Sequence, residues 1–189
     1  MTNEEKLEIF RKTGALQEGH FLLSSGLHSN IYFQCALVLQ YPSYATLFCG
    51  EIADFFSSFD FDTVISPAIG GILVGQEVAR LLGKRSIFTE RTDGFMNLRR
   101  GFSLSKNERV LICEDVVTTA KSTKEVMSVI EQSGAVPVGL GSIVDRTTEQ
   151  PELDFPFFST IKISAEVFTQ EQCPLCKENI PFIKPGSRK

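Results

Sequence analysis

The segment Val110–Thr123 reads VLICEDVVTTAKST. Its first four residues are apolar and predict a buried strand, which two adjacent carboxylates, Glu114 and Asp115, follow directly. A hydroxyl-rich turn then leads into a helix, for which Ser122 is the expected N-cap and Glu125 its partner in a capping box. A helix N-terminus suits a phosphate, and carboxylates beside it suit sugar hydroxyls or a magnesium ion that holds them. The segment therefore predicts a pocket for a sugar phosphate.

The sequence on either side alternates between strand and helix patterns. Short apolar strands are expected at 63–65, 86–89, 109–113 and 136–144. Helices are expected after the first and third of these strands, and they end at Gly83 and Gly134. This β-α-β order predicts an α/β fold with a mostly parallel, twisted sheet flanked by helices.

The N-terminal part of the chain is less uniform. Thr2 and Glu5 form a capping box for a short helix over 2–13, whereas residues 20–40 lack a regular period. An amphipathic helix is expected to begin at Tyr41-Pro42.

Composition narrows the class of protein. The chain has 189 residues, 42% of them hydrophobic, and a net charge of −4, which argues against non-specific nucleic-acid binding. No apolar run approaches the roughly 18 residues of a membrane span, and the acidic N-terminus does not resemble a secretory signal. Five cysteines, an odd number, fit reduced thiols better than a disulfide framework. We therefore expect a cytoplasmic protein of one domain, with at most a small appendage.

Polar loops follow the predicted strands. In open α/β sheets, ligands bind beyond the carboxyl ends of the strands. The loops expected there are 66–71, 90–102, 114–122 and the pair Asp145-Arg146. Their convergence would form one site.

Two of these loops suit the parts of a sugar phosphate. Glu114 and Asp115 would bind ribose hydroxyls and favour a cationic ribose, although adjacent loop carboxylates are commonly just solvated. The Thr118–Ser122 turn would hold the 5-phosphate with its N–H groups, although it could equally be an ordinary helix cap. Pro67-Ala68-Ile69-Gly70-Gly71 fits a pyrophosphate-binding loop or a plain strand-to-helix turn.

The segment 90–102 carries the three arginines Arg91, Arg99 and Arg100. It fits either a solvated hairpin or a mobile lid that closes over a polyanion. In the second case the arginines would neutralise a pyrophosphate leaving group. Arg146, at the end of another strand, suits a carboxylate partner or is a surface residue at a turn.

The C-terminal tail contains Cys173 and Cys176 at zinc-knuckle spacing. A structural zinc site usually has four ligands, so one such pair would need a dimer to complete it, and metal binding here is not expected. His20 and His28 flank Ser24-Ser25-Gly26, where one of them could line the site, although a surface or core role is the expectation for both.

With these motifs in place, the chain resembles the type I phosphoribosyltransferases, and within them the orotate phosphoribosyltransferase family, from about His20 to the tail. The matching segments are Gly19–Ser29, Ser66–Gly71, Phe88–Arg91, Leu98–Phe102, Cys113–Thr119 and Ile143–Arg146. The resemblance implies transfer of the phosphoribosyl group of phosphoribosyl pyrophosphate (PRPP) to orotate, giving orotidine 5-monophosphate and pyrophosphate in pyrimidine biosynthesis.

The resemblance also implies the remaining details of the fold and site. One domain over 1–189 would have a core at about 42–150 and a hood from about 1–40 and 155–189. Catalytic residues would be Arg91, Arg99, Arg100 and Asp115. PRPP would be bound by Ala68, Ile69, Gly70, Glu114, Asp115, Val116, Val117, Thr118, Thr119, Ala120, Lys121 and Ser122. Orotate would be bound by Thr118, Arg146, Ser24, Tyr32 and Phe33. Mg²⁺ would bind mainly through PRPP, with Glu114 and Asp115 as further candidates, and the chain would form a homodimer whose loop 90–102 reaches the neighbouring site.

The chain departs from the family pattern at several positions. Ala120 stands where the family usually has glycine, Lys121 replaces a small residue, and Ser24 stands where many members have lysine. The loop 91–102 contains no lysine, so an arginine would have to act there. The alternatives are a phosphoribosyltransferase for another nucleobase and a PRPP-binding regulator of weak catalytic power.

Overall fold

The computed structural model describes residues 1–23, 25–163 and 166–185 and contains two compact units. One unit is Leu39–Lys162, and the other combines Met1–Val38 with Ile163–Lys189. The larger unit extends beyond the expected end at about 150 because one further strand, β8 (Phe157–Lys162), joins its sheet. Ser24 lies outside the described residues.

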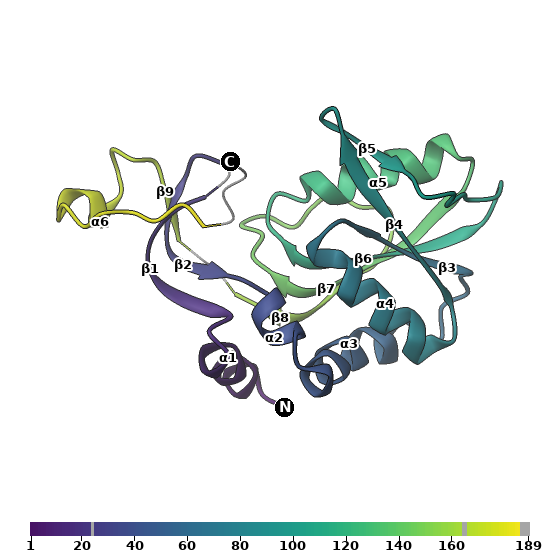
Figure 1. Ribbon diagram of the computed structural model, residues 1–189, viewed down its shortest axis with the longest axis horizontal. Helices are drawn as coiled ribbons and strands as arrows, with labels where there is room; N and C mark the ends of the chain where they lie inside the picture. Colours follow the sequence, from purple (N-terminus) through teal and green to yellow (C-terminus); the bar gives the residue numbers. More distant parts are fainter. Residues whose placement is uncertain (24, 164–165, 186–189) are drawn as a thin grey trace. The chain divides into compact units, whose positions relative to one another are not determined.

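The larger unit is built on a six-stranded sheet with the order β5-β4-β3-β6-β7-β8 (Figure 1). Its strands are β3 (Thr63–Pro67), β4 (Arg85–Thr92), β5 (Phe95–Leu98), β6 (Arg109–Val117), β7 (Val136–Asp145) and β8 (Phe157–Lys162). All neighbouring strands run parallel except the edge strand β5, which is antiparallel to β4. The α/β fold with a mostly parallel sheet is thus confirmed.

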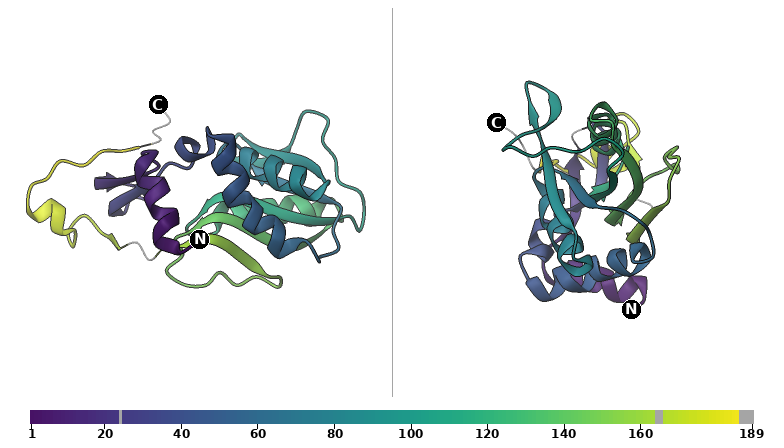
Figure 2. Two further views of the ribbon diagram at one scale, coloured as in Figure 1. Left: turned by 90° about the horizontal axis from the view of Figure 1, so that it is seen from below. Right: turned by 90° about the vertical axis from the view of Figure 1, so that its right-hand side faces the viewer.

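Helices cover both faces of this sheet (Figure 2). The helices are α3 (Pro42–Phe56), α4 (Gly70–Leu82) and α5 (Lys121–Gln132). α3 packs closely on β7, where a Cβ added to Gly139 would lie 3.0 Å from Phe56. α5 packs on the opposite face, where Val126 and Ile130 join a buried cluster with Ile112 of β6. Successive side chains of a strand alternate between faces, so the near-continuous apolar runs in the sequence follow from helices on both sides.

The structure corrects the expected start of α5. β6 extends to Val117, four residues beyond its expected end, so Glu114 and Asp115 lie within the strand. The helix begins at Lys121 after an Ala120 N-cap, and no side chain of the described residues caps it. Ser122 is therefore not the N-cap, because the early left-handed turn at Ala120 already starts the helix.

The segment 90–102 is also more regular than expected. β4 continues to Thr92 and pairs with β5 across a tight turn at Asp93 and Gly94, both of which have positive φ. An Asp-Gly pair of this kind is typical of two-residue hairpin turns. The hairpin interpretation describes the backbone here, and the mobility of the segment stays a prediction.

The smaller unit contains a three-stranded antiparallel sheet in the order β1-β2-β9. Its elements are α1 (Asn3–Lys12), β1 (Leu16–Leu22), β2 (His28–Phe33), β9 (Val167–Phe168) and α6 (Pro174–Lys177), and the short α2 (Ala36–Leu39) follows β2. The Thr2–Glu5 capping box of α1 is confirmed. The expected irregularity of 20–40 is wrong, because a hairpin occupies most of it. Within the described ranges, no helix is both long enough and apolar enough to cross a membrane.

Candidate active site

The direction in which the chain crosses the sheet changes between β3 and β6. Successive connections run outward from these two strands in opposite directions, which makes their carboxyl ends the topological switch point of the sheet. Gly70, at the start of α4, lies directly against Asp115 of β6, since a Cβ at Gly70 would be only 2.6 Å from the Asp115 Cγ. The structure thus brings the loops 66–71 and 114–122 together.

Backbone groups fix the loop 66–71. The Ala68 N–H donates a hydrogen bond to the carbonyl oxygen of Thr89 at 2.8 Å, and the peptide bond between Ala68 and Ile69 is cis. The Ile69 side chain is exposed. The backbone of this loop is thus held against β4, while the Ile69 side chain points away from the protein interior.

The two adjacent carboxylates point to opposite faces of the sheet. The buried Glu114 faces α5, where the Thr123 hydroxyl donates a hydrogen bond to its Oε2 at 2.8 Å. Asp115 faces the start of α4 at Gly70. Burial raises the pKa of Glu114 to about 7, against the opposing effect of Thr123, and burial also raises the pKa of Asp115. The two carboxylates therefore contact different helices, α5 and α4.

The turn before α5 exposes polar groups and backbone. Thr118, Thr119 and Lys121 are exposed, while Ala120 is buried with φ 54°, in the left-handed region. A depression of about 400 Å³ adjoins this turn and is lined by Thr119, Lys121, Lys124, Glu125 and Ser128. Because α5 has no side-chain cap within the described part of the chain, its first N–H groups are available to an anion.

The three arginines of the hairpin have different surroundings. Arg91 forms an ion pair with Glu125 of α5, with 3.1 Å between Nη1 and Oε1. Arg100 binds Glu90 through two hydrogen bonds of 2.8 Å. Arg99 is exposed and forms no ion pair among the residues that the structure describes. Of the three arginines, Arg99 is therefore the one whose guanidinium group is not held by a carboxylate of the described residues.

Arg146 follows β7 and is only 8% exposed. Its N–H donates a hydrogen bond to the Val117 carbonyl oxygen at 2.8 Å, so the residue lies beside the end of β6. The structure therefore places the backbone of Arg146 at the same edge of the sheet as the turn that begins at Thr118, and its side chain is buried.

The predicted aromatic pair lies on β2 of the smaller unit. Phe33 is 5% exposed and packs edge-on against Phe10 at 5.8 Å, so its ring belongs to the core of that unit. Tyr32 is half-buried beside Phe21. Tyr32 is thus the less buried of the two, and the contact of either ring with a base stays a prediction.

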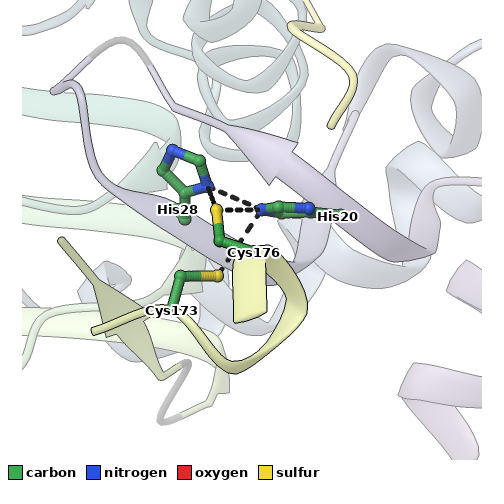
Figure 3. Close-up of side chains that lie close together, drawn as sticks. All are labelled: His20, His28, Cys173 and Cys176. Carbon is green, nitrogen blue, oxygen red and sulfur yellow. Dashed lines mark hydrogen bonds between the residues drawn. The ribbon is translucent and has the colours of Figure 1, made fainter. Parts of the chain in front are cut away.

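Sequence reasoning treated the histidines and the tail cysteines separately, and the structure brings them together. His20, His28, Cys173 and Cys176 lie side by side in the smaller unit (Figure 3). The expectation that the cysteine pair finds no further ligands in its own chain is therefore wrong. The signal in the sequence was that the only two histidines of the chain flank one hairpin tip.

Comparisons with known proteins identify the class of protein. A family model described as "Phosphoribosyl transferase domain" matches residues 50–175, two thirds of the chain. The chain belongs to this phosphoribosyltransferase family.

Close relatives define the branch of the family. The orotate phosphoribosyltransferase of Caldanaerobacter subterraneus subsp. tengcongensis is 51% identical over 189 residues, covering all of both chains. That of Chlorobaculum parvum is 52% identical over 188 residues, covering 100% of this chain and 97% of the relative. By these matches the chain is an orotate phosphoribosyltransferase family member.

Solved structures agree on the fold. The orotate phosphoribosyltransferase from Aeropyrum pernix has a TM-score of 0.66 at 23% identity, covering 82% of this chain and 92% of that one. An adenine phosphoribosyltransferase from Thermoanaerobacter pseudethanolicus has a TM-score of 0.62 at 16% identity, covering 70% and 88%. At these identities the likeness describes the fold, which enzymes for different bases share.

Proposed function

We propose that this chain transfers the 5-phosphoribosyl group of PRPP to orotate. A bond forms between a ring nitrogen of orotate and the anomeric carbon of the ribose, the bond from that carbon to pyrophosphate breaks, and orotidine 5-monophosphate and pyrophosphate leave. The observation that carries the proposal is the convergence of Gly70, Asp115 and the uncapped start of α5 at the switch point of the sheet. Positioning and electrostatics then supply most of the catalysis, without a nucleophilic side chain.

The turn from Thr118 to Ser122 is the proposed site of the 5-phosphate. The first N–H groups of α5 donate hydrogen bonds to it, helped by the exposed hydroxyls of Thr118 and Thr119 and by the charge of Lys121. The ribose then lies over the end of β6, where Val116 and Val117 contribute backbone. Asp115 is the carboxylate that faces the glycine loop, and Glu114 supports the turn through Thr123.

Mg²⁺ with PRPP fits this site. Burial raises the pKa of the half-buried Asp115, a nearby cation would favour its ionised form by charge attraction, and carboxylate oxygens are ligands that Mg²⁺ prefers. Asp115, with Glu114 as a second candidate, would hold the ion together with oxygens of the substrate. When bound, Mg²⁺ neutralises part of the charge that develops on pyrophosphate.

Pyrophosphate would leave toward the loop 66–71, and the hairpin would supply cations. Arg99 is the best candidate, since Arg91 and Arg100 are already paired with carboxylates. In a homodimer, the segment 90–102 would reach the site of the neighbouring copy. Arg91 would then act mainly by fixing the hairpin against Glu125 of α5.

Orotate carries a carboxylate, and Arg146 is its proposed partner. The guanidinium is buried at the carboxyl edge of the sheet, where charge-assisted hydrogen bonds are strong. Thr118 would add a contact to the base, and the contacts of Tyr32 and Phe33 to a base stay predictions from the family pattern.

The direct test is the loss of orotate absorbance when protein, orotate, PRPP and Mg²⁺ are mixed. We expect a loss that requires all four components. Binding of PRPP by calorimetry without any loss of orotate would contradict the proposal. Turnover of another base would then identify a different phosphoribosyltransferase, and no turnover with any base would favour a regulator.

Arg146→Ala tests the orotate contact. We expect the KM for orotate to rise about 10- to 100-fold, as for a lost hydrogen bond between charged groups, while the KM for PRPP changes little. Arg109→Ala, at the opposite end of β6, is the matched control and should leave both constants near their original values. An equal rise of both KM values in Arg146→Ala would argue against the assigned role.

A further inference from the structure

Four metal-ligating side chains meet in the smaller unit. His20 lies on β1, His28 on β2, and Cys173 and Cys176 lie at the two ends of one turn that includes α6 (Figure 3). One ligand atom from each of the four lies within 4.8 Å of all the others. His20, His28 and Cys173 are buried, and Cys176 is half-buried.

The distances suit tetrahedral coordination. The Cys176 Sγ lies 3.7 Å from the His20 Nε2 and 3.4 Å from the His28 Nδ1, and the Cys173 Sγ lies 3.5 Å from the His20 Nε2. Two ligands of a tetrahedral zinc ion, at typical Zn–S and Zn–N bond lengths, are separated by about 3.6 Å. The two nitrogens lie 2.6 Å apart. They need to separate by less than about 1 Å to bind one zinc ion together.

A second contact orients one of the imidazoles. The carbonyl oxygen of Ile180 lies 2.7 Å from the His20 Nδ1 and accepts its proton. This bond leaves the lone pair of the His20 Nε2 directed at the cluster, as in metal sites where a carbonyl fixes the histidine tautomer. The Phe182 ring contacts both imidazoles edge-on, at 5.8 and 5.2 Å, and forms an apolar wall.

The strand register explains why the two histidines face one side. His28 pairs with Leu22, so on a regular strand the residue two before Leu22 shares its face. That residue is His20. The register shifts between Glu18 and Phe21, and such a bulge redirects side chains, here leaving both His20 and Phe21 buried.

The C-terminal segment 171–184 has almost no apolar core of its own. Cys173 is its only buried side chain, and Ile180, Phe182 and Ile183 are exposed. Backbone hydrogen bonds from Ile183 to His20 and from Leu22 to Ile183 tie the segment to β1. A small element without a core commonly depends on a metal or a disulfide for its order.

We propose that His20, His28, Cys173 and Cys176 bind one structural Zn²⁺ ion that fastens the C-terminal segment to the β1–β2 hairpin. Two thiolates, two neutral imidazoles and Zn²⁺ form a site without net charge, which suits burial. All four positions are protein ligands, so the site is closed to water and structural in type. All five cysteines are free thiols in the structure, and a Cys173–Cys176 disulfide is the competing arrangement.

The first experiment measures zinc in the purified full-length protein. After incubation with excess Zn²⁺ and gel filtration, we expect one zinc ion per chain by elemental analysis. Replacement by Co²⁺ should give the visible bands of tetrahedral cobalt and a near-ultraviolet thiolate-to-cobalt band. Less than about one tenth of an equivalent of zinc, or an octahedral cobalt spectrum, would overturn the proposal. So would a protein that lacks zinc and is lighter by two hydrogens, as a disulfide requires.

The second experiment uses matched cysteine variants. Cys176→Ala removes a half-buried proposed ligand, and Cys35→Ala removes a buried thiol of the same unit that lies outside the cluster. We expect Cys176→Ala to weaken zinc binding at least about 100-fold, more than the loss of a second contact to a metal ligand does. Cys35→Ala should bind zinc as the original protein does. Equal zinc binding in the two variants would contradict the four-ligand site.

Discussion

The two units of this chain position their polar groups by different means. In the unit Leu39–Lys162, buried strands with helices on both faces set the sites of Asp115 and Arg146. In the smaller unit, the segment 171–184 has a single buried side chain, and histidines and cysteines gather around it. A sheet edge can thus place polar groups through packing, whereas the short tail has little packing of its own and lies against the side chains of the proposed zinc site.

Metal removal should produce the largest difference between the two units. If zinc orders the tail, a strong chelator should accelerate amide hydrogen exchange in residues 171–183 by about 1000-fold or more, since structural zinc sites contribute several kcal/mol to local order. Exchange in β3 and β6 should not change. The measurement is hydrogen exchange read by mass spectrometry with and without chelator, and re-addition of Zn²⁺ should restore protection. Equal acceleration in both units, or in neither, would contradict the proposal that zinc orders the C-terminal segment of the smaller unit alone.

Gly70→Ala tests the packing of the larger unit. The new methyl group would overlap the Asp115 carboxylate, because a Cβ there lies 2.6 Å from its Cγ. We expect kcat/KM to fall about 100-fold, as for a displacement of about 1 Å in an active site. Gly50→Ala, in the middle of α3 with no atom within 4 Å of its Cβ, is the control and should stabilise the protein by about 1 kcal/mol. Full activity in Gly70→Ala would show that this contact does not position the site.

Glu114→Gln tests the cost of a buried carboxyl group. Burial raises its pKa from 4.5 to about 7 in the folded protein. Below pH 4.5 the group is protonated in both states and has no effect on stability. Between pH 4.5 and about 7 only the folded state retains the proton, so the free energy of unfolding falls as the pH rises. We expect Glu114→Gln to stabilise the protein by about 3 kcal/mol at pH 8 and to have little effect at pH 4.5, by urea unfolding.

Glu108→Gln is the matched control of opposite sign. Burial raises the pKa of Glu108, but hydrogen bonds from a backbone N–H, Thr63 and Arg85 outweigh it and lower the pKa overall. Its stabilising effect is present above pH 4.5 and is lost as the pH falls, so Glu108→Gln should destabilise the protein at pH 8. A Glu114→Gln effect that does not change with pH would show that its cause is packing and not ionisation.

The sequence predicts the larger unit better than the smaller one. Apolar runs ended by Gly83 and Gly134 are local signals, and the parallel sheet follows from their alternation. The site loops could be located because parallel strands end at one edge. The opposite directions of Glu114 and Asp115 could not be predicted. They depend on whether β6 ends at Cys113, before these two residues, or at Val117, beyond them.

The His–Cys cluster depends on contacts that local patterns do not encode. His20 and Cys173 are 153 positions apart, and no local spacing pattern links a histidine to a cysteine so distant in the sequence. The Asp93-Gly94 pair, by contrast, is a local signal for a two-residue hairpin turn, which the sequence analysis did not use. Long-range pairing therefore accounts for what was missed in the smaller unit.

Ala120→Gly should have the smallest effect, and it tests a departure from the family pattern inside the larger unit. Ala120 has φ 54° and ψ 21°, a left-handed conformation that costs a residue with a Cβ about 1–2 kcal/mol. Glycine removes this cost, but it also gives the unfolded chain more conformational freedom. That freedom lowers the free energy of unfolding by about 0.5–1 kcal/mol. We expect a net stabilisation of about 1 kcal/mol in urea unfolding. Ala135→Gly, in the same buried cluster but without a positive φ, should instead destabilise the protein. If both substitutions destabilise equally, the packing of the Ala120 methyl group outweighs its backbone strain, and alanine is then the better residue for this turn.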